Sequence, residues 1–443
     1  MTQRPDHIGV ARDPGRYGLQ LHDGELYMGG VALSAVAKQL GTPTYVYDAS
    51  VIESRLAALR AAVGHRPTTI CYAVKANSSL AVLRLMGRHG AGADIVSGGE
   101  LQRALRAGIP AERIVFSGVG KTDAEIDAAI EAGVGSINLE SAEELEQVAA
   151  RARAQGRVAA VALRVNPDID PKTHPYLATG LQESKFGISM AAALPVARRA
   201  HANPALRLVG LGCHIGSQIT EVEPFVDSVA RVRRLVDTLA SEGIELHHLD
   251  LGGGLGIGYR PDDPALDVEA WGRAVAEATA GLSLELVFEP GRWLVANAGV
   301  LLTRVLGRKQ GATKGFVVVD AAMNDLLRPS LYQAYHVVVP TRWPRDGDPT
   351  ELVDVVGPVC ESGDFLALGR TLPVSRPGEV LAVLSAGAYG MTMASTYNTR
   401  PLPAEAMIWG DEIHVIRPRQ TIEQLLASER VPAWLHSERE PAD

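Results

Sequence analysis

A lysine inside an apolar segment is the first residue whose placement suggests covalent chemistry. Lys75 lies in "CYAVKANSS", which begins at Cys71. A lysine at the end of a strand often extends its ammonium into solvent, but one held in a dry pocket has a lowered pKa and becomes a nucleophile that can form a Schiff base. We therefore expect a lowered pKa for Lys75. Pyridoxal phosphate is the cofactor that uses such a lysine.

Two other features meet the demands of that cofactor. The segment "DLGGGLGIG" supplies the glycines Gly252, Gly253 and Gly254, whose backbone N–H groups suit a phosphate. The segment "EPGR" begins with Glu289, a carboxylate that can keep a pyridinium nitrogen protonated. Three glycines can also form an ordinary tight turn. A dinucleotide fingerprint fits less well, because these glycines follow the seventh predicted strand and not the first.

These residues sit at the ends of a repeated strand-helix pattern. Short β-branched runs alternate with Ala/Leu/Arg-rich helical stretches, which predicts a parallel sheet covered on both faces. Eight such strands favour a closed (β/α)8 TIM-type barrel over an open, doubly wound sheet. Functional groups of such a barrel collect at the carboxyl ends of its strands. The strands are expected at residues 68–76, 92–97, 114–118, 136–141, 161–167, 211–217, 249–254 and 286–291.

After residue 291 strands follow one another through turns, which predicts a second, antiparallel β-barrel or sandwich domain. The N-terminal "LQLHDGELYMGG" reads as a hairpin with Asp23-Gly24 at its turn. We expect a barrel over residues 46–292 and a β domain made of residues 18–45 and 293–430. Residues 1–17 and 431–443 are polar, bear prolines and charges, and are expected to be flexible ends.

Composition excludes several classes of function. The 443 residues are 46% hydrophobic and 21% charged, with a net charge of -8, so a globular fold is expected and a nucleic-acid partner is not. No apolar run approaches the about 20 residues of a membrane span, and the polar N-terminus does not resemble a signal peptide. Three scattered cysteines form no CxxC pair, which argues against disulfides or a metal site. We expect a cytoplasmic protein.

Taken together, the motifs resemble the fold-type III pyridoxal-phosphate decarboxylase family. The resemblance runs from about Gly41 to Gln420 and follows the order of the family. The motifs are "YAVKAN" at Tyr72, "GADIVSGGEL" at Gly92, "FSGVGKT" at Phe116, "RVNPDIDPKTHPYLATG" at Arg164, "SKFGI" at Ser184, "CHIGSQ" at Cys213, "DLGGGLGI" at Asp250, "EPGR" at Glu289, "DAAMNDLLRPSLYQAYH" at Asp320, "GPVCESGD" at Gly357 and "GAYGMTMASTYNTRP" at Gly387.

The resemblance implies roles for residues around the cofactor. Lys75 would carry pyridoxal phosphate, His214 would stack on its ring and take part in catalysis, and Glu289 would pair with the ring nitrogen. The remaining cofactor-binding positions implied are Asp94, Ser217, Gly252, Gly253, Gly254, Gly291, Arg292 and Tyr389.

Substrate binding is implied for Arg292, Arg328, Tyr332, Glu361 and Tyr389. A guanidinium meets a carboxylate with two parallel hydrogen bonds, which suits the two arginines to a second carboxylate. Cys360 would be the proton donor. By resemblance, Cys360 and Glu361 would enter the active site of a partner subunit, so a homodimer is expected.

The reaction implied is decarboxylation of meso-2,6-diaminopimelate to L-lysine and CO2, the last step of lysine biosynthesis by that route. Three alternatives remain open. A decarboxylase of another basic amino acid or a carboxylated polyamine, of the ornithine or arginine type, would use the same barrel. An amino-acid racemase shares the lysine-bearing barrel but needs a second catalytic acid or base. A non-catalytic pyridoxal-phosphate carrier would leave the β domain without a purpose.

Overall fold

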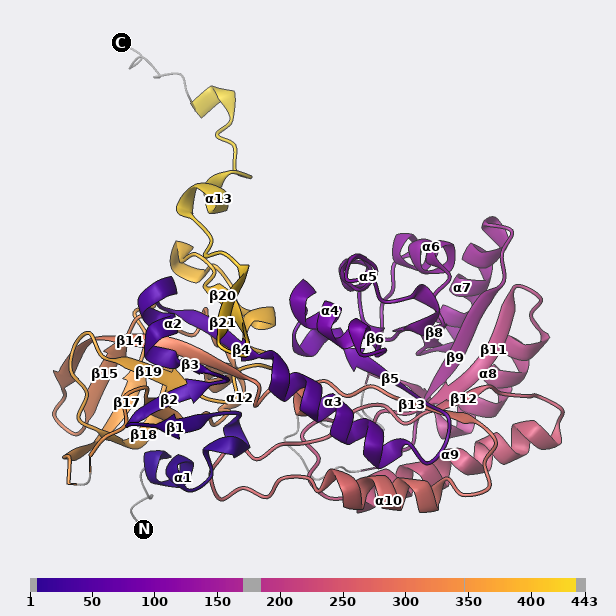
Figure 1. The fold of residues 1–443 in the computed structure, drawn as a ribbon. Coiled ribbons are helices and arrows are strands. Elements are labelled where there is room, and N and C mark those ends of the chain that lie inside the picture. Colours follow the sequence, from indigo (N-terminus) through magenta and orange to yellow (C-terminus); the bar gives the residue numbers. More distant parts are fainter. Residues whose placement is uncertain (1–5, 170–184, 346, 436–443) are drawn as a thin grey trace.

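The computed structural model describes residues 6–169, 185–345 and 347–435, and its larger unit is a closed parallel barrel (Figure 1). Each strand pairs in parallel with the next, and β13 pairs with β5 to close the ring. The predicted (β/α)8 barrel is therefore confirmed. The strands are β5 (Thr68–Ala73), β6 (Gly92–Ile95), β7 (Ile114–Phe116), β8 (Ser136–Leu139), β9 (Ala159–Asn166), β11 (Leu206–Gly212), β12 (His248–Asp250) and β13 (Glu285–Phe288).

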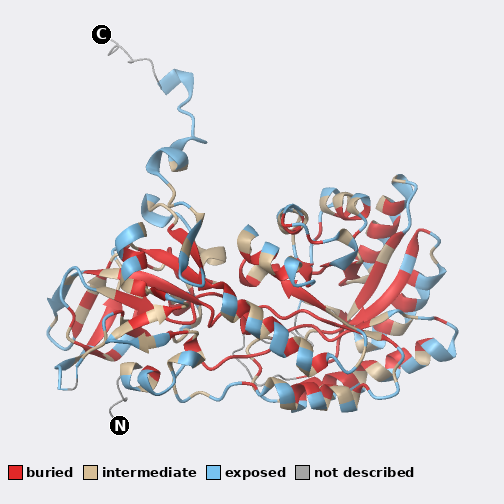
Figure 2. Cartoon of the chain, in the orientation of Figure 1, coloured by how far each residue is buried: buried red, intermediate tan, exposed pale blue. Residues whose placement is uncertain are grey.

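Helices cover the outside of the barrel, so its strands are buried on both faces (Figure 2). Several helices begin at polar caps that the sequence supplies: Thr122 and Glu125 form a reciprocal capping box, and Asp48 and Ser141 accept hydrogen bonds from first-turn N–H groups. The helices are α3 (Ala49–Val63), α4 (Leu80–Arg88), α5 (Gly98–Arg106), α6 (Asp123–Ala132), α7 (Ala142–Ala154), α8 (Met190–Ala202), α9 (Glu223–Ser241) and α10 (Val268–Ala278); a short β10 (Ile188–Ser189) adds to β9.

The second unit is a mixed β-sheet domain beside the barrel (Figure 1). Its strands are β4 (Thr44–Asp48), β14 (Gly299–Gln310), β15 (Gly315–Val319), β16 (Val338–Pro340), β17 (Thr350–Val356), β18 (Phe365–Pro373), β19 (Val380–Val383), β20 (Ala404–Trp409) and β21 (Glu412–Arg417). The prediction of a purely antiparallel domain is wrong in two places. β15 pairs with β17 in parallel, and so does β4 with β20, because long connections separate each pair in sequence.

The N-terminal segment packs on the β domain. β1 (Gln20–His22) and β2 (Glu25–Met28) form the expected hairpin, followed by β3 (Val31–Ala32) and α2 (Leu33–Leu40). Leu26 and Met28 share a buried cluster with Val300 and Val337 of the β domain. β4 also extends the β-domain sheet to Asp48, so the barrel begins after residue 48 and not at residue 46.

The two ends of the chain differ from each other. Residues 6–17 are not the flexible end that their polarity predicted, because α1 (Asp6–Arg12) and the turn after it bury Val10 and Tyr17 against the β domain. The C-terminal part leads away from the body through α13 (Ile422–Leu426), and Val431 to Leu435 are exposed; residues 436–443 lie outside the described residues (Figure 1).

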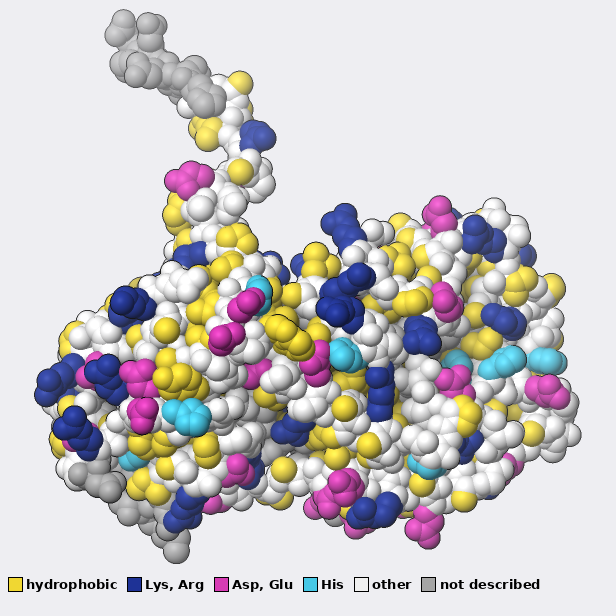
Figure 3. Space-filling model, viewed as in Figure 1, with side chains coloured by type: hydrophobic (Ala, Val, Ile, Leu, Met, Phe, Trp, Pro, Cys, Tyr) yellow, Lys and Arg dark blue, Asp and Glu magenta, His cyan; other side chains and the backbone are white. Residues whose placement is uncertain are grey.

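Acidic and basic side chains are interspersed over the face of the molecule seen in Figure 3. Among the helices that the structure describes, none has the length and apolar character needed to cross a membrane.

Candidate active site

A cavity of about 540 Å³ lies where the carboxyl ends of the barrel strands meet the β domain. Ten residues predicted from the sequence line it together. From the barrel come Lys75, His214, Ser217, Gly254, Glu289, Gly291 and Arg292, and from the β domain come Arg328, Tyr332 and Tyr389. The two domains meet at the lysine segment itself, because the Tyr389 N–H donates to the Ala76 carbonyl over 2.7 Å and Asn77 Nδ2 donates to the Gly387 carbonyl over 3.1 Å.

Lys75 is paired with an acid from the neighbouring strand. Its Nζ lies 2.9 Å from Oδ2 of Asp94, which is fully buried in β6. Burial by itself lowers the pKa of Lys75, but the charges of Asp94 and Glu289 outweigh burial, and the pKa of Lys75 lies above its ordinary value. The expected lowering of this pKa is therefore wrong, because the sequence alone does not reveal which carboxylates the adjacent strands place beside the ammonium.

Three buried carboxyl groups, those of Asp94, Asp250 and Glu289, lie near one another at this end of the cavity. Burial, followed by the charges of Asp250 and Asp94, raises the pKa of Glu289 well above its ordinary value. Burial also raises the pKa of Asp250 to about 6. Since Lys75 is one cation among three acids, the group can accept a further positive charge close to Glu289.

The glycine turn leaves no room for side chains. A Cβ at Gly253 would stand 2.2 Å from the Glu289 carbonyl oxygen, and one at Gly252 would stand 2.6 Å from the Cys213 carbonyl oxygen. Gly252 and Gly254 also have positive φ angles of 68° and 97°, which favour glycine. The backbone can therefore approach a phosphate closely. Ser217, which follows the neighbouring strand β11, lines the same cavity.

His214 is neutral in this environment. Burial, with smaller contributions from the charges of Arg164 and Lys75, lowers the pKa of His214 well below its ordinary value. Its Nδ1 accepts a hydrogen bond from the Gly253 N–H over 3.1 Å, which places the ring proton on Nε2. A neutral imidazole next to the glycine turn presents an uncharged face to a planar ring.

Two arginines from different domains converge on the cavity. Arg292, in α11 (Arg292–Val295), donates to Ser217 Oγ over 2.9 Å and to Tyr259 Oη over 2.6 Å. Arg328, in α12 (Arg328–Tyr332), donates to His336 Nε2 over 2.8 Å. Both arginines are buried, and neither forms an ion pair with an acidic side chain in the described parts of the chain.

Cys360 and Glu361 stand apart from the other predicted residues. Both are exposed in the loop between β17 and β18, and neither lines the cavity of its own chain. The Cys360 N–H donates to Asn398 Oδ1 over 2.9 Å. Cys71 and Cys213 are buried, and burial raises the pKa of each thiol, to about 12 for Cys213, so both are packing residues.

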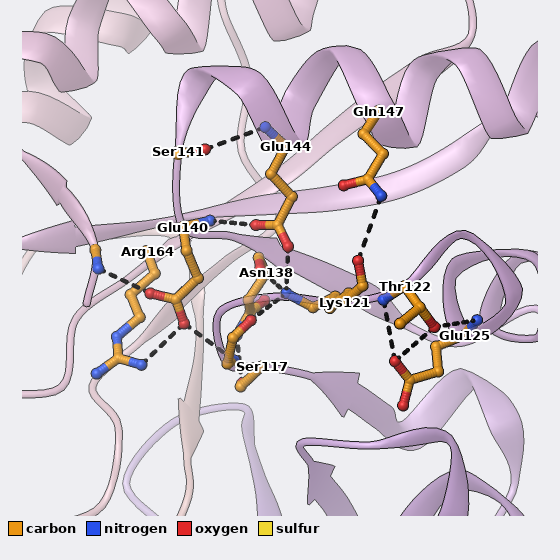
Figure 4. A network of polar contacts seen from close by, with 12 residues as sticks. Ser117, Lys121, Thr122, Glu125, Asn138, Glu140, Ser141, Glu144, Gln147 and Arg164 are labelled. Atoms are coloured by element: carbon orange, nitrogen blue, oxygen red, sulfur yellow. Dashed lines mark hydrogen bonds and ion pairs between the residues drawn. The ribbon is translucent and has the colours of Figure 1, made fainter. Parts of the chain in front are cut away.

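A polar network behind the barrel rim was missed by sequence reasoning (Figure 4). Lys121 donates to Glu144, while Glu140 accepts from Arg164 and from the Gly118 N–H. The network reaches the site through Ser117, which accepts from Asn138 over 3.1 Å and donates to Glu289 Oε1 over 3.3 Å. Ser117 occurs in "FSGVGKT", so its motif was recognised, but nothing in the sequence indicated the contact with Glu289.

Tyr259 was also missed, although it lies five residues after Gly254 in the recognised glycine segment. It is buried, lines the cavity and contacts both arginines. Its position, one step beyond "GGGLGIG", was the only signal in the sequence.

The site fits pyridoxal phosphate on three observations of its own residues. Asp94 Oδ1 is buried without a hydrogen-bond partner, which leaves an acceptor free beside Lys75. Glu289 stands in an acid-rich group that favours a protonated ring nitrogen. The glycine turn admits a phosphate where a Cβ would not fit.

Comparison with known proteins gives consistent results. The sequence family described as "Pyridoxal-dependent decarboxylase, pyridoxal binding domain" matches residues 49–296. The diaminopimelate decarboxylase of Pseudomonas aeruginosa is 52% identical over 92% of this chain and 97% of its own, and that of Vibrio cholerae is 48% identical over the same shares.

Solved structures agree in fold. The diaminopimelate decarboxylase of Helicobacter pylori complexed with L-lysine matches with a TM-score of 0.85 and 41% identity, covering 89% of this chain and 98% of that one. The M. jannaschii enzyme in co-complex with L-lysine matches with a TM-score of 0.90 and 36% identity, covering 94% and 98%. A Vibrio vulnificus lysine/ornithine decarboxylase, at 23% identity and a TM-score of 0.74, shares the fold.

Proposed function

Because this chain belongs to the pyridoxal-dependent decarboxylase family, and within it to the diaminopimelate decarboxylases, we infer that it converts meso-2,6-diaminopimelate to L-lysine and CO2. The observation that carries this inference is a single cavity that combines a lysine and a buried acid with two buried arginines. Among the described residues, neither arginine forms an ion pair with an acidic side chain. The reaction completes lysine biosynthesis from diaminopimelate. We also propose a cytoplasmic location, which suits three free cysteines.

We assign the cofactor end of the cavity as follows. Lys75 holds pyridoxal phosphate covalently, and the glycine turn with Ser217 binds its phosphate. His214 covers one face of the ring, and Glu289 pairs with the ring nitrogen. When bound, the cofactor supplies an electron sink for the pair that the departing carboxylate leaves behind. Ser117 and Asp250 form hydrogen bonds with the Glu289 carboxyl and thereby fix its orientation towards the ring nitrogen.

We assign the opposite end of the substrate to the arginines. Arg292 and Arg328 bind the carboxylate that does not react, with Tyr332 and Tyr389 lining the space between. Holding the distant end fixes which carboxylate of a symmetric-looking substrate lies at the reacting position. Burial excludes water from both guanidinium groups and strengthens their attraction for an anion.

We propose that the protein acts as a homodimer in which each subunit completes the cavity of the other. Cys360 returns a proton to the α carbon, and Glu361 meets the distal ammonium of the substrate. The support is their exposure in one loop outside their own cavity, together with the family resemblance of "CESGD". A second subunit would bring these two side chains to the site that lacks them.

The test is CO2 release with product identification. Purified protein with pyridoxal phosphate is offered meso-diaminopimelate, L-ornithine, L-arginine and L-lysine separately. We expect release from meso-diaminopimelate alone, with L-lysine as product. Lys75→Ala should abolish it, whereas Lys38→Ala, an exposed lysine of α2, should not. Preference for ornithine or arginine would overturn the roles of Arg328 and Glu361, and binding of the cofactor without any turnover would favour a carrier.

A further inference from the structure

Tyr259 is a buried cavity residue that the proposed mechanism does not use. It follows β12 and the glycine turn, and its side chain faces the same cavity as Lys75 and the two arginines. Only 7% of its surface is exposed. A tyrosine in such a place needs a partner for its hydroxyl, and the identity of that partner indicates what the residue does.

One phenol contacts both guanidinium groups. Its hydroxyl oxygen accepts the hydrogen bond from Arg292 Nη1, over 2.6 Å. The Cζ atom of Arg328 lies 4.7 Å from the centre of its ring, within the range of a cation–π contact. Arg292 comes from the barrel and Arg328 from the β domain, so Tyr259 joins the two halves of the proposed carboxylate site.

A histidine is the second partner of Arg328. His336 Nδ1 lies 2.8 Å from the Leu384 carbonyl oxygen, which can only accept, so Nδ1 carries the proton and Nε2 accepts from Arg328. Burial, and then the charge of Arg328, lowers the pKa of His336 to about 3, which keeps its ring neutral. Arg328 therefore contacts both a neutral imidazole and the ring of Tyr259, and these two rings pack edge to face with their centres 5.4 Å apart.

These partners hold the arginines without cancelling their charge. An acidic side chain here would hold them as well, but it would neutralise the site. A phenol and an imidazole supply acceptors and an aromatic face, and both positive charges remain available. Arg292 Nε is moreover buried without a hydrogen-bond partner. The pair is thus arranged to receive an external anion.

We propose that Tyr259 is a positioning residue that sets the spacing of Arg292 and Arg328 and thereby makes the cavity select an amino acid with a second carboxylate. This inference rests on the proposed function, since it identifies the second carboxylate as the part of the substrate that the site recognises. A substrate that ends in a bare ammonium gains nothing from this arrangement.

The experiment compares two ligands that differ in one carboxylate. Calorimetry measures the binding of L-lysine and of 1,5-diaminopentane to the holoenzyme, for wild type and for Tyr259→Phe, which keeps the ring and removes the hydroxyl. We expect the Kd of L-lysine to rise about tenfold, because a hydrogen bond to a charged group is lost, and that of 1,5-diaminopentane to stay the same. In turnover, KM for meso-diaminopimelate should rise similarly, with kcat changed by less than about twofold.

Controls separate positioning from general damage. Tyr27→Phe changes a tyrosine of the N-terminal hairpin and should leave the Kd of both ligands unchanged. Tyr259→Leu, which removes the ring as well, should raise the Kd of L-lysine more than Tyr259→Phe does. Unchanged L-lysine binding in Tyr259→Phe, or an equal loss for both ligands, would overturn the proposal. Because binding is measured without turnover, a wild-type enzyme that does not decarboxylate meso-diaminopimelate would refute the proposed reaction and leave this test decisive.

Discussion

Glu289 shows how strongly a single buried residue depends on its neighbours. Alone in an apolar site, its carboxyl would take up a proton. In this cavity the charges of Asp250 and Asp94 raise the pKa of Glu289 further, and the charge of Lys75 lowers it. The carboxyl is thus set to ionise when a cation approaches, which is the property that a partner of a protonated ring nitrogen needs.

This balance predicts a pH dependence of stability. The pKa values of Glu289 and Asp250 are raised in the folded state, Asp250 to about 6, so the folded chain binds protons that the unfolded chain releases. Stability should therefore increase as pH falls from about 7 towards 5, and this gain is lost as pH rises through the folded pKa values. In Glu289→Gln, Tm should change less with pH than in the wild type, and the difference over this pH interval should be roughly 2–4 °C.

Melting curves from pH 5 to 8 test this in protein stripped of cofactor, where Glu289 has no added cation. Glu131→Gln, which changes an exposed acid of α6, serves as the matched control and should follow the wild type. If Tm depends on pH in the same way in Glu289→Gln and in the wild type, the pKa of the Glu289 carboxyl is not raised in the folded protein.

At the scale of elements, the turn after β12 is the phosphate site that we propose. Its backbone passes so close to the chain after β13 that only glycine fits at position 253. The contact joins two neighbouring strands of the barrel rim, β12 and β13, which pair in register. The turn is thus fixed by the barrel and does not depend on its own sequence alone.

Gly253→Ala should therefore lower cofactor affinity. The added methyl group meets backbone, which cannot move aside as a side chain can, so the turn must shift. We expect the Kd for pyridoxal phosphate to rise about tenfold to a hundredfold, measured by absorbance titration. Gly307→Ala, in β14 with nothing within 4 Å of the new methyl, is the control and should bind normally. Normal cofactor binding by Gly253→Ala would remove the turn from the phosphate site.

At the scale of the whole molecule, the cavity depends on two domains held together. Asn77 and Tyr389 join the lysine segment to the β domain beside the cavity. The same chain carries Cys360 and Glu361 on an exposed loop elsewhere. The residues of the proposed cofactor end thus lie together in one chain, whereas we propose that the proton donor comes from a second copy.

Mixed dimers test that division. Lys75→Ala and Cys360→Ala should each be inactive, but co-expressed they should recover about one quarter of wild-type activity, since half of random dimers are mixed and each has one intact site. Lys75→Ala co-expressed with Gly253→Ala should show no more activity than the Gly253→Ala subunits provide by themselves, because both changes lie in the cofactor end of one subunit. If the first pair fails as well while dimers form, Cys360 does not act across an interface.

Local sequence determined much of this protein. Strand and helix periods predicted all eight barrel strands, and motifs identified ten residues that line one cavity, because the barrel rule places strand ends on a single rim. The family resemblance supplied the reaction. These features are encoded by residue type and spacing along short stretches of chain.

Tertiary structure decided the rest, since it depends on contacts between distant residues. The pKa of Lys75 rises because β6 and β13 bring Asp94 and Glu289 beside it. β15 and β17 run parallel because a long connection returns the chain to the end from which β15 starts. Val10 is buried because the β domain covers it. Tyr259 acquires its place between two arginines only when barrel and β domain meet. Charge balance, strand direction and shared partners are properties of neighbours in space, and no window of the sequence contains them.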